Sequence, residues 1–316
     1  MDIASVCIIG GSGFVGRSVA EQTAARGIRV RVVTRSAPRA RDLLVLPTLE
    51  TMVADPNDDP ALARCLDNMD AVVNLVGILH PTGRATFAST HVELPRRIAR
   101  ACRTAGVRQL LHMSALGASA SGPSQYLRSK AAGEEAVRAA GAELPFTIFR
   151  PSVIFGEHDR FLNLFALLAR VSAVIPLACA GARFQPIWVE DVARAFVSSL
   201  GEPRALGSTY ELCGPRAYTL EELVRFVAAT LGHPRRVVAL PAGIATLQAM
   251  VLEHLPGKLL TRDNLRSMSV DNVCAGPFPQ VFGFEPAPLE AIAPEYLAGA
   301  GSSRARYQRF RAYAGR

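Results

Sequence analysis

A tyrosine and a lysine four residues apart, Tyr126 and Lys130, are the side chains in this sequence best suited to proton transfer. Residues i and i+4 lie on the same face of a helix, so the two side chains would be neighbours. A lysine cation beside a tyrosine lowers the pKa of the phenol toward values useful for acid–base catalysis near neutral pH. The spacing therefore predicts an acid–base pair, and the alternative is an ordinary exposed pair on a helix surface.

Three glycines near the start of the chain predict a dinucleotide site. Gly11, Gly13 and Gly16 have the G-x-G-x-x-G spacing, follow an apolar run at 4–10 and open a helix-like stretch at 14–26. Such glycines permit a tight turn and let the backbone approach a pyrophosphate, which the amides of the helix N-terminus then bind. The alternative is a glycine-rich turn without a ligand. The expected cofactor contacts in this turn are Gly10, Gly11, Ser12, Gly13, Phe14, Val15 and Gly16.

The end of the second expected strand indicates the type of dinucleotide. NAD-binding proteins usually carry Asp or Glu about 20 residues after the glycines, where it holds the ribose hydroxyls. Thr34 and Arg35 stand there instead, with Arg39 and Arg41 close behind. Because these cations can pair with a 2′-phosphate, the sequence favours NADP(H) over NAD(H). The alternative is that Arg35 is only a solvated loop residue.

Three residues at the ends of other expected strands extend the predicted cofactor site. Asp55 ends the third strand, where its carboxylate can accept a hydrogen bond from an adenine amino group. Asn74 and Gly77 end the fourth strand, near the ribose and the distal phosphates. Two of them have structural alternatives, because Asp55 could cap the following turn and Asn74 could be a core amide with its hydrogen bonds made.

Strands and helices alternate over the first half of the chain. Short apolar runs predict buried strands, and stretches with apolar residues at helical spacing predict helices between them. Almost continuous apolar strands in such units indicate a parallel sheet with helices on both faces. The expected fold class is α/β, a doubly wound parallel (Rossmann) sheet with a smaller C-terminal substrate lobe. The expected strands are 4–10, 28–34, 49–55, 70–78, 108–114 and 146–156, and the expected helices are 14–26, 58–69, 87–106 and 124–140.

After residue 156 the alternation ends, and proline and glycine become frequent. The dinucleotide-binding core is expected to cover 1–156, with 184–214 returning to it as a short extended piece, a helix and a possible strand at 208–214. The substrate lobe is expected to consist of 157–183 and 215–300, followed by a basic tail at 301–316.

The chain of 316 residues carries 35 Lys and Arg against 27 Asp and Glu, a net charge of +8. This excess fits either an arginine-rich solvated surface or a polyanion partner, and nucleic acid is not an expected partner.

The apolar stretch 161–182 contains Asn163, Arg170 and Pro176, so it predicts a packed helix or an active-site cover, with a membrane-surface contact as the alternative. The tail at 302–316, with five arginines, is expected to be solvated or to bind anionic lipid or a partner.

The cysteines and histidines indicate neither disulfides nor a metal site. The six cysteines (7, 65, 102, 179, 213 and 274) form no C-x-x-C pair, and several lie in apolar runs. They are expected to be reduced and structural, in a cytoplasmic protein, and the N-terminus lacks the pattern of a signal peptide. The histidines have no Cys or carboxylate at ligand spacing, and His112 is expected to be a satisfied core residue.

Four motifs together resemble the short-chain dehydrogenase/reductase superfamily, in its extended and atypical, epimerase/dehydratase-like branches: GGSGFVG, YLRSK with AAGE after it, RPSVIFG and QPIWVEDVA. Two longer segments, RPSVIFGEHDRFLNLFA and LPGKLLTRDNLRSMSVDNV, are similar to one atypical subgroup. That subgroup contains the nucleotide-binding accessory subunit of respiratory complex I and its bacterial relatives. The resemblance extends to about residue 297.

The resemblance implies roles for the residues at matching positions. Tyr126 would be the acid or base, and Lys130 would support it and hold the ribose. The glycines at 10, 13 and 16 would contact the pyrophosphate, and the nicotinamide would lie beside Pro151, Ser152 and Val153.

The sequence departs from the superfamily at the third catalytic position. The superfamily places a Ser or Thr after the fifth strand, often as the second hydroxyl of a pair, whereas HMSALGAS has Ala115 there and Ser114 before it. Ser114 is therefore the candidate for this role, with Ser119 or Ser121 as alternatives. Loss of one such donor can lower a rate by ~10²–10³.

Two main hypotheses of function follow. The first is an NADP(H)-dependent oxidoreductase or epimerase that acts by hydride transfer on an unknown small molecule. The second is a non-catalytic NADPH-binding structural or assembly protein of a respiratory or quinone-related complex, peripheral to the inner membrane, which Ala115 and the basic tail favour. A redox sensor that binds NADPH and a partner is a third. The sequence leaves the substrate and the oligomeric state undefined.

Overall fold

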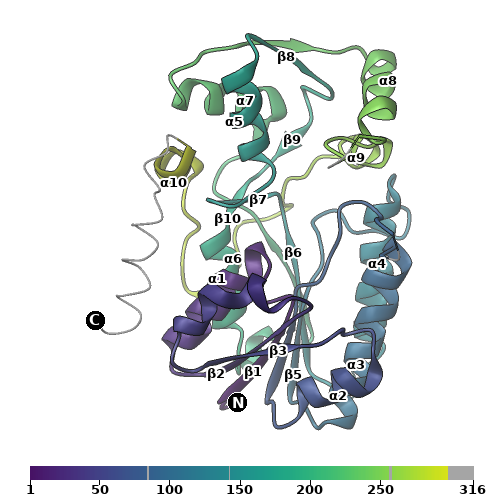
Figure 1. Cartoon of the computed structure of the whole chain (residues 1–316), viewed down its shortest axis with the longest axis vertical. Coiled ribbons are helices and arrows are strands. Elements are labelled where there is room, and N and C mark those ends of the chain that lie inside the picture. Colours follow the sequence, from purple (N-terminus) through teal and green to yellow (C-terminus); the bar gives the residue numbers. More distant parts are fainter. Residues whose placement is uncertain (84, 142, 256–257, 298–316) are drawn as a thin grey trace.

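A seven-stranded parallel sheet forms the centre of the molecule, in a computed structural model that describes residues 1–83, 85–141, 143–255 and 258–297 (Figure 1). Its order is β11-β6-β5-β4-β1-β2-β3, which confirms the expected doubly wound α/β fold. The strands are β1 (Ser5–Ile9), β2 (Arg29–Thr34), β3 (Leu49–Val53), β4 (Ala71–Asn74), β5 (Gln109–Met113), β6 (Phe146–Pro151) and β11 (Ser208–Leu212).

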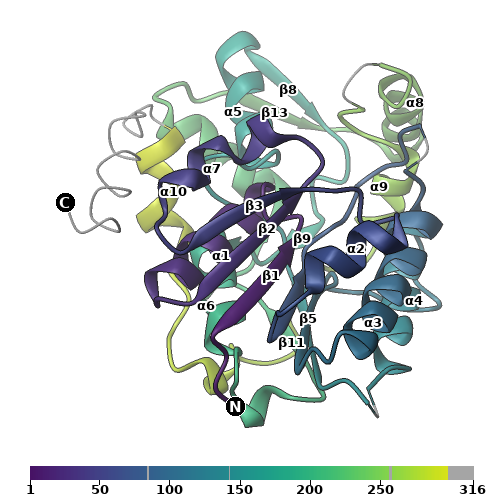
Figure 2. The ribbon, with the colours of Figure 1, turned by 60° about the horizontal axis from the view of Figure 1, so that its bottom comes forward.

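Both faces of the sheet are covered, because successive side chains of each strand point to opposite faces. In β1, Val6 and Ile8 pack on one side, and Cys7 and Ile9 on the other. Figure 2 shows helices on each side of the sheet. The first face is covered by α1 (Phe14–Ala25) and α6 (Val189–Ser198), and the second by α2 (Asp59–Leu66), α3 (Leu94–Thr104) and α4 (Gln125–Arg138).

The sheet reverses its strand order at β1, whose neighbours are β2 and β4. In such sheets ligands bind beyond the carboxyl ends of the strands at the point of reversal. The glycine turn that follows β1 and the loop that follows β4 therefore lie at the expected ligand-binding edge.

A second hydrophobic core lies above the carboxyl ends of the sheet strands (Figure 1). The apolar stretch 161–182 contributes to it, since Leu162, Phe165 and Ala169 are buried there. The expected packed helix is confirmed over Leu162–Val171 only, because Val174–Leu177 form strand β8 instead. Within the described residues no helix is both long and apolar enough to cross a bilayer. The elements of this region are β7 (Ile154–Phe155), α5 (Leu162–Val171), β8 (Val174–Leu177), β9 (Arg183–Phe184), β10 (Ile187–Trp188), β12 (Tyr218–Thr219), α7 (Leu220–Thr230), β13 (Arg236–Ala239), α8 (Ala242–Leu252), α9 (Arg262–Ser267) and α10 (Leu289–Leu297).

Three local differences separate the expected elements from the observed ones. The expected strand 146–156 ends in the sheet at Pro151, and β7 pairs with β10 instead. The expected helix 87–106 begins as a π-helix, η2 (Ala88–Glu93), and continues as α3. Residues 35–48, for which no element was expected, contain a 3₁₀ helix, η1 (Ala37–Val45); two further short turns of this type are η3 (Pro203–Ala205) and η4 (Gln280–Phe282).

The expectation that every cysteine is reduced is wrong, because Cys213 and Cys274 form a disulfide with their Cα atoms 6.0 Å apart. The two residues are 61 positions apart in the sequence, so no local spacing of cysteines could predict the bond. The described structure leaves Cys7, Cys65, Cys102 and Cys179 as thiols. The bond attaches the segment around residue 274 to the end of β11.

Replacement of one bonded cysteine tests this disulfide. Cys274→Ser should lower the free energy of unfolding by about 2–4 kcal/mol, since the bond closes a long loop in the unfolded chain. Urea denaturation with and without a thiol reductant measures the effect. Reductant should shift the midpoint of the wild type and leave that of Cys274→Ser in place.

The matched control is Cys179→Ser, which replaces a half-exposed thiol. Its midpoint should respond to reductant as the wild type does. The disulfide assignment would be contradicted if reductant left the wild-type midpoint unchanged although thiol titration showed that every cysteine was reduced.

Candidate active site

The glycine turn between β1 and α1 has the geometry of a phosphate cradle. Gly10 has a φ of +88°, a conformation that favours glycine, and its carbonyl accepts a 3.0 Å hydrogen bond from the amide of Gly13. A Cβ on Gly16 would lie 2.3 Å from the Gly10 oxygen, so only glycine fits there. No side chain of the described residues caps α1, which leaves the amides of Phe14 and Val15 able to bind an anion.

The end of β2 is attached to this turn by hydroxyl groups. Ser12 and Thr34 share a hydrogen bond of 3.0 Å, and the amide of Ser36 donates to the Thr34 hydroxyl. Arg35 is exposed and forms no ion pair within the described part of the chain. The space beside the turn therefore carries a cation and no carboxylate from β2, which fits a phosphate better than a bare ribose.

Asp55 and Asn74 both make the structural contacts that the sequence offers as alternatives to cofactor binding. The Asp55 carboxylate accepts from the backbone and side-chain amides of Asn57, and the backbone hydrogen bond holds its pKa below the usual range. The Asn74 side chain accepts from the amide of Val76 and bonds to His112. Asn74 is buried, so it shapes the β4 end from within the core.

The amine of Lys130 lies beside Gly77, in the loop after β4, because the fourth strand ends at Asn74 and does not reach residue 78 as expected. It donates to the Met113 carbonyl at 3.2 Å, and a Cβ on Gly77 would lie 3.1 Å from its Nζ. A residue larger than glycine at position 77 would therefore displace the amine. Burial lowers the pKa of Lys130 to about 8, so the amine is still mainly protonated at neutral pH.

The pKa of the Tyr126 phenol is raised in the structure, whereas the sequence predicted that it would be lowered. Its ring packs edge-on against the rings of Phe87 and His91, with centroids 6.1 and 5.6 Å away. Burial among these groups raises the pKa of Tyr126 to about 12. The predicted lowering by Lys130 is therefore wrong for this structure, because desolvation of the phenolate dominates and the phenol stays protonated.

His91 was not predicted as a site residue and holds the neighbouring elements together. Its Nε2 accepts from the Ile78 amide at 3.0 Å, so its Nδ1 carries the proton and faces the Ser129 hydroxyl at 2.8 Å. Burial lowers the pKa of His91 to about 2, which keeps the ring neutral. The ring thereby links the loop after β4 to the helix that carries Tyr126. A lone histidine in an expected helix gave no signal of this role.

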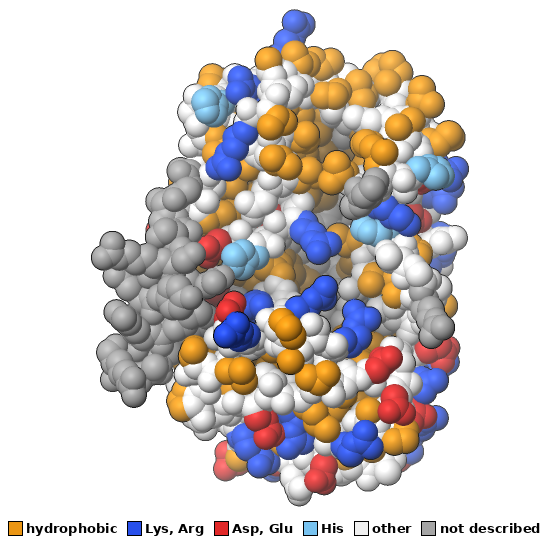
Figure 3. Space-filling model, viewed as in Figure 1, with side chains coloured by type: hydrophobic (Ala, Val, Ile, Leu, Met, Phe, Trp, Pro, Cys, Tyr) orange, Lys and Arg blue, Asp and Glu red, His pale blue; other side chains and the backbone are white. Residues whose placement is uncertain are grey.

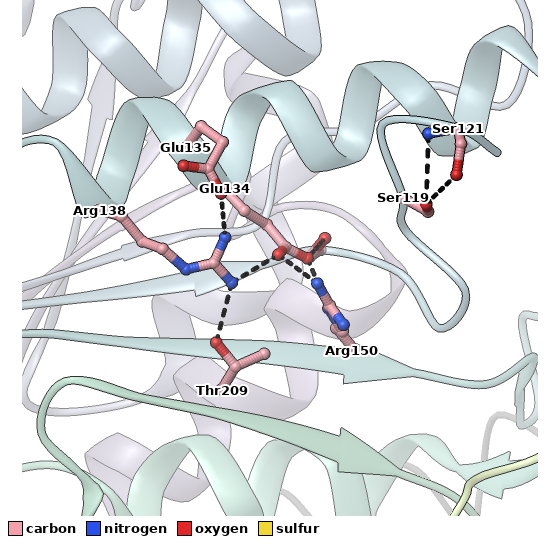
Figure 4. Close-up of polar contacts among 8 residues, drawn as sticks. Ser119, Ser121, Glu134, Glu135, Arg138, Arg150 and Thr209 are labelled. Carbon is pink, nitrogen blue, oxygen red and sulfur yellow. Dashed lines mark hydrogen bonds and ion pairs between the residues drawn. The ribbon is translucent and has the colours of Figure 1, made fainter.

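Ser114 does not offer a free hydroxyl. The Ser114 hydroxyl donates to Glu134. The Glu134 side chain is fully buried and also accepts from Arg150 and Arg138 (Figure 4). Burial pushes the pKa of Glu134 upward, but the hydrogen bonds from Arg150 and Ser114 outweigh it and hold the pKa below its usual range. The side chain of Ser114 is thus part of a buried ionic cluster.

The alternative hydroxyls lie away from this cluster. Ser119 and Ser121 are exposed and bond to each other at 3.1 Å (Figure 4). Ala115 is buried and contributes no polar group. Of the three candidates for the third hydroxyl, Ser114 is therefore bonded to Glu134, and Ser119 and Ser121 are bonded to each other.

The segment expected beside the nicotinamide is fastened to the C-terminal region. The Ser152 hydroxyl donates to the side chain of Asn272 at 2.6 Å, and the Val153 amide donates to the same oxygen at 3.1 Å. The Pro151 carbonyl accepts from the Leu116 amide. Because Asn272 lies two residues before the disulfide, the bond at Cys274 stabilises this side of the site.

The N-terminus of α4 is capped from far along the chain. The Asp263 carboxylate accepts from the amides of Gln125 and Tyr126 at 2.8 and 3.0 Å. Ser124, the N-cap residue, accepts from Leu127 and pairs with the hydroxyl of Ser267. An anion at a helix N-terminus is stabilised by the helix dipole, so α9 positions the helix that presents Tyr126.

The described residues contain no group of three His, Cys, Asp or Glu that could hold a metal ion. The expectation that His112 is fully satisfied is only half correct. Its Nδ1 bonds to the Asn74 amide, whereas its Nε2 is buried without a hydrogen-bond partner among those residues. Burial lowers the pKa of His112 to about 3, so the ring is neutral.

Comparison with known proteins gives one family. The model of the NAD dependent epimerase/dehydratase family matches residues 6–213. Subunit 9 of the NADH dehydrogenase [ubiquinone] 1 alpha subcomplex is 33% identical over 259 residues in Arabidopsis thaliana and 31% over 299 residues in Mus musculus. The matched segments cover 80% and 92% of this chain, and 64% and 78% of those proteins.

Two further similarities concern a bacterial enzyme and the fold. A protein of Caulobacter vibrioides named ceramide reductase is 36% identical over 253 residues, covering 78% of this chain and 77% of that protein. The solved structure of a nucleoside-diphosphate-sugar epimerase from Staphylococcus aureus has a TM-score of 0.72 at 15% identity. That alignment covers 93% of this chain and 99% of the other, and it supports the fold alone.

The buried cluster around Glu134 gives a stability test. Glu134→Gln should lower the free energy of unfolding by about 2–3 kcal/mol, since it removes the carboxylate that Arg150 and Arg138 share, although both arginines are partly solvated and Arg138 keeps its ion pair with Glu135. The wild type should lose this difference as the pH falls below the ordinary glutamate pKa of about 4.3, because the pKa of Glu134 is lower in the folded protein than in the unfolded chain. Denaturation midpoints of both proteins between pH 3 and 7 measure it.

The matched control is Glu135→Gln, at the neighbouring residue, which is 73% exposed. Its effect should stay below about 0.5 kcal/mol. Equal losses for Glu134→Gln and Glu135→Gln would argue against the cluster.

Proposed function

Because the chain belongs to the NAD dependent epimerase/dehydratase family, we propose that it is an NADP(H)-binding oxidoreductase of the short-chain dehydrogenase type. The observation that carries the proposal is the buried Lys130 amine beside Gly77, at the same edge of the sheet as the glycine turn. A protonated amine in that position can hold ribose hydroxyls while the amides of the turn bind the phosphates. The region of 157–183 and 215–300 would select the substrate.

The proposed chemistry is the reduction of a carbonyl group. The nicotinamide, when bound, supplies a hydride to the carbonyl carbon. Tyr126 donates its phenolic proton to the carbonyl oxygen; that proton is present at neutral pH, since the pKa of the phenol lies above its ordinary value of about 10. Lys130, one turn along α4, offsets the negative charge that forms on the tyrosine. The substrate panel should include long-chain carbonyl compounds, since one relative is named ceramide reductase.

Tyr126→Phe tests catalysis. The substitution removes the donated proton and keeps the ring, so kcat should fall by about 10²–10⁴ with little change in NADPH affinity. NADPH consumption with quinones, aldehydes, sugar nucleotides and long-chain ketones gives the rate, and nicotinamide fluorescence gives the affinity. Turnover by Tyr126→Phe at the wild-type rate would exclude the proposed acid.

Arg35→Ala tests the cofactor preference. Loss of one charge-assisted contact to the 2′-phosphate should lower the affinity ratio of NADPH to NADH about tenfold or more. Fluorescence titration of both nucleotides gives the ratio, and Arg64→Ala, at an exposed arginine on α2, is the control. An unchanged ratio in Arg35→Ala would remove the argument for NADP(H).

A second function, a non-catalytic NADPH-binding subunit at a respiratory or quinone-related membrane complex, is favoured by two observations. Ser114 is engaged by Glu134, and Ala115 supplies no hydroxyl. The relatives named as NADH dehydrogenase subunits suggest such a location, peripheral to the inner membrane. Binding of NADPH that raises the melting temperature, with no turnover of any substrate class, would select this function over catalysis.

A further inference from the structure

Helix α8 is mainly apolar, with Thr246 and Gln248 as its polar residues, and it is buried on only one side. Its sequence, AGIATLQAMVL, carries no charge, and its small residues Ala245 and Ala249 face the protein interior. Ile244, Leu247 and Val251, spaced i, i+3 and i+7 on one face, are 54%, 60% and 57% exposed. Helices with apolar residues around most of their circumference are normally buried on most sides. We therefore expect the exposed outer face of α8 to contact an apolar environment.

The exposed apolar surface extends beyond α8. Figure 3 shows hydrophobic side chains gathered over the upper region, whereas most visible acidic side chains lie over the lower half. We name this surface the apolar end; its exposed residues are Leu167, Val171, Val174, Val238, Ile244, Leu247, Met250, Val251, Leu255 and Leu259. Contiguous apolar surfaces of this kind mark sites of interaction with proteins or membranes.

Basic residues accompany the apolar end. The segments 160–178 and 231–270 contain seven Lys and Arg against two acidic residues. Both acids are engaged: Glu253 pairs with Arg262 at 2.7 Å, and Asp263 caps α4. Arg236, which pairs in register with Val174 across β8 and β13, is exposed and forms no ion pair with any described residue.

We propose that the apolar end docks on the surface of an anionic lipid membrane. Ile244, Leu247 and Val251 would enter the boundary between headgroups and acyl chains, and Arg236 would lie among the lipid phosphates. A second copy of the chain is a poorer occupant, because a symmetric contact would bring the same arginines against one another. The proposal concerns lipid binding and does not depend on nucleotide turnover.

Vesicle flotation of the full-length protein tests the proposal. Vesicles of phosphatidylcholine with about 30 mol% phosphatidylglycerol should bind the wild type, more weakly in 1 M salt, where charges are screened beyond ~3 Å. Leu247→Ser/Val251→Ser should reduce the partition coefficient at least tenfold. Leu44→Ser/Val45→Ser is the matched control, since these residues are 56% and 54% exposed on η1 and should leave binding unchanged.

Charge reversal provides the second arm. Arg236→Glu should weaken binding to anionic vesicles several-fold, while Arg64→Glu on α2 should have little effect. A variant with the tail arginines Arg304, Arg306, Arg309, Arg311 and Arg316 changed to Gln should keep the sensitivity to Leu247→Ser/Val251→Ser.

Three outcomes would overturn the proposal. They are no vesicle binding by the wild type, equal binding by both double-serine variants, and a dimer in light scattering that only Leu247→Ser/Val251→Ser dissolves. The last result would make the apolar end an interface between copies. NADPH titration of each variant separates lipid binding from the proposed function, since affinity for the nucleotide should be unchanged throughout.

Discussion

The buried carboxylate of Glu134 is the interaction on which the geometry of the site depends. It lies one helical turn after Lys130 on α4 and binds residues of three elements, through Ser114 after β5, Arg150 on β6 and Arg138 on α4 itself. A buried charge is costly unless it is paired and its hydrogen bonds are made, so α4 is held where all these partners meet. The rotation of α4, and with it the position of the Lys130 amine, follows from this constraint.

The other end of α4 is fixed by the C-terminal region. Asp263 caps the first turn of α4 through two backbone amides, and the Ser267 hydroxyl adds a contact to Ser124. The helix that presents Tyr126 is therefore attached to the sheet through the carboxylate of Glu134 and to α9 through the carboxylate of Asp263. Asn272 makes an equivalent connection at Ser152 and Val153, secured by the disulfide at Cys274. A shift of α9 or of the segment around Asn272 would therefore move both the start of α4 and the segment at Ser152 and Val153.

Local patterns predicted the fold. Parallel strands that are buried on both faces have short apolar sequences, and the helices between them have apolar residues at helical spacing. The glycine turn was equally local, and Gly10 and Gly16 have the conformation and the close contact that only glycine allows. The contacts that organise the site were not local. Asp263 lies 137 residues from Tyr126, and Asn272 lies 120 from Ser152, distances over which one sequence carries no pairing signal. The pKa of Tyr126 was misjudged for a related reason, since i, i+4 spacing shows proximity but not burial.

The same ionic cluster explains why Ser114 cannot easily replace the hydroxyl that is missing at Ala115. A hydroxyl that donates to a buried carboxylate cannot also polarise a substrate without leaving Glu134 short of a donor, so Ser114 is retained by a structural need. In the function proposed above, polarisation of a carbonyl oxygen would fall to the phenol of Tyr126, which is protonated at neutral pH as an ordinary tyrosine is, and whose pKa burial raises further. A protonated phenol is the correct form of the acid for reduction and the wrong form of the base for oxidation.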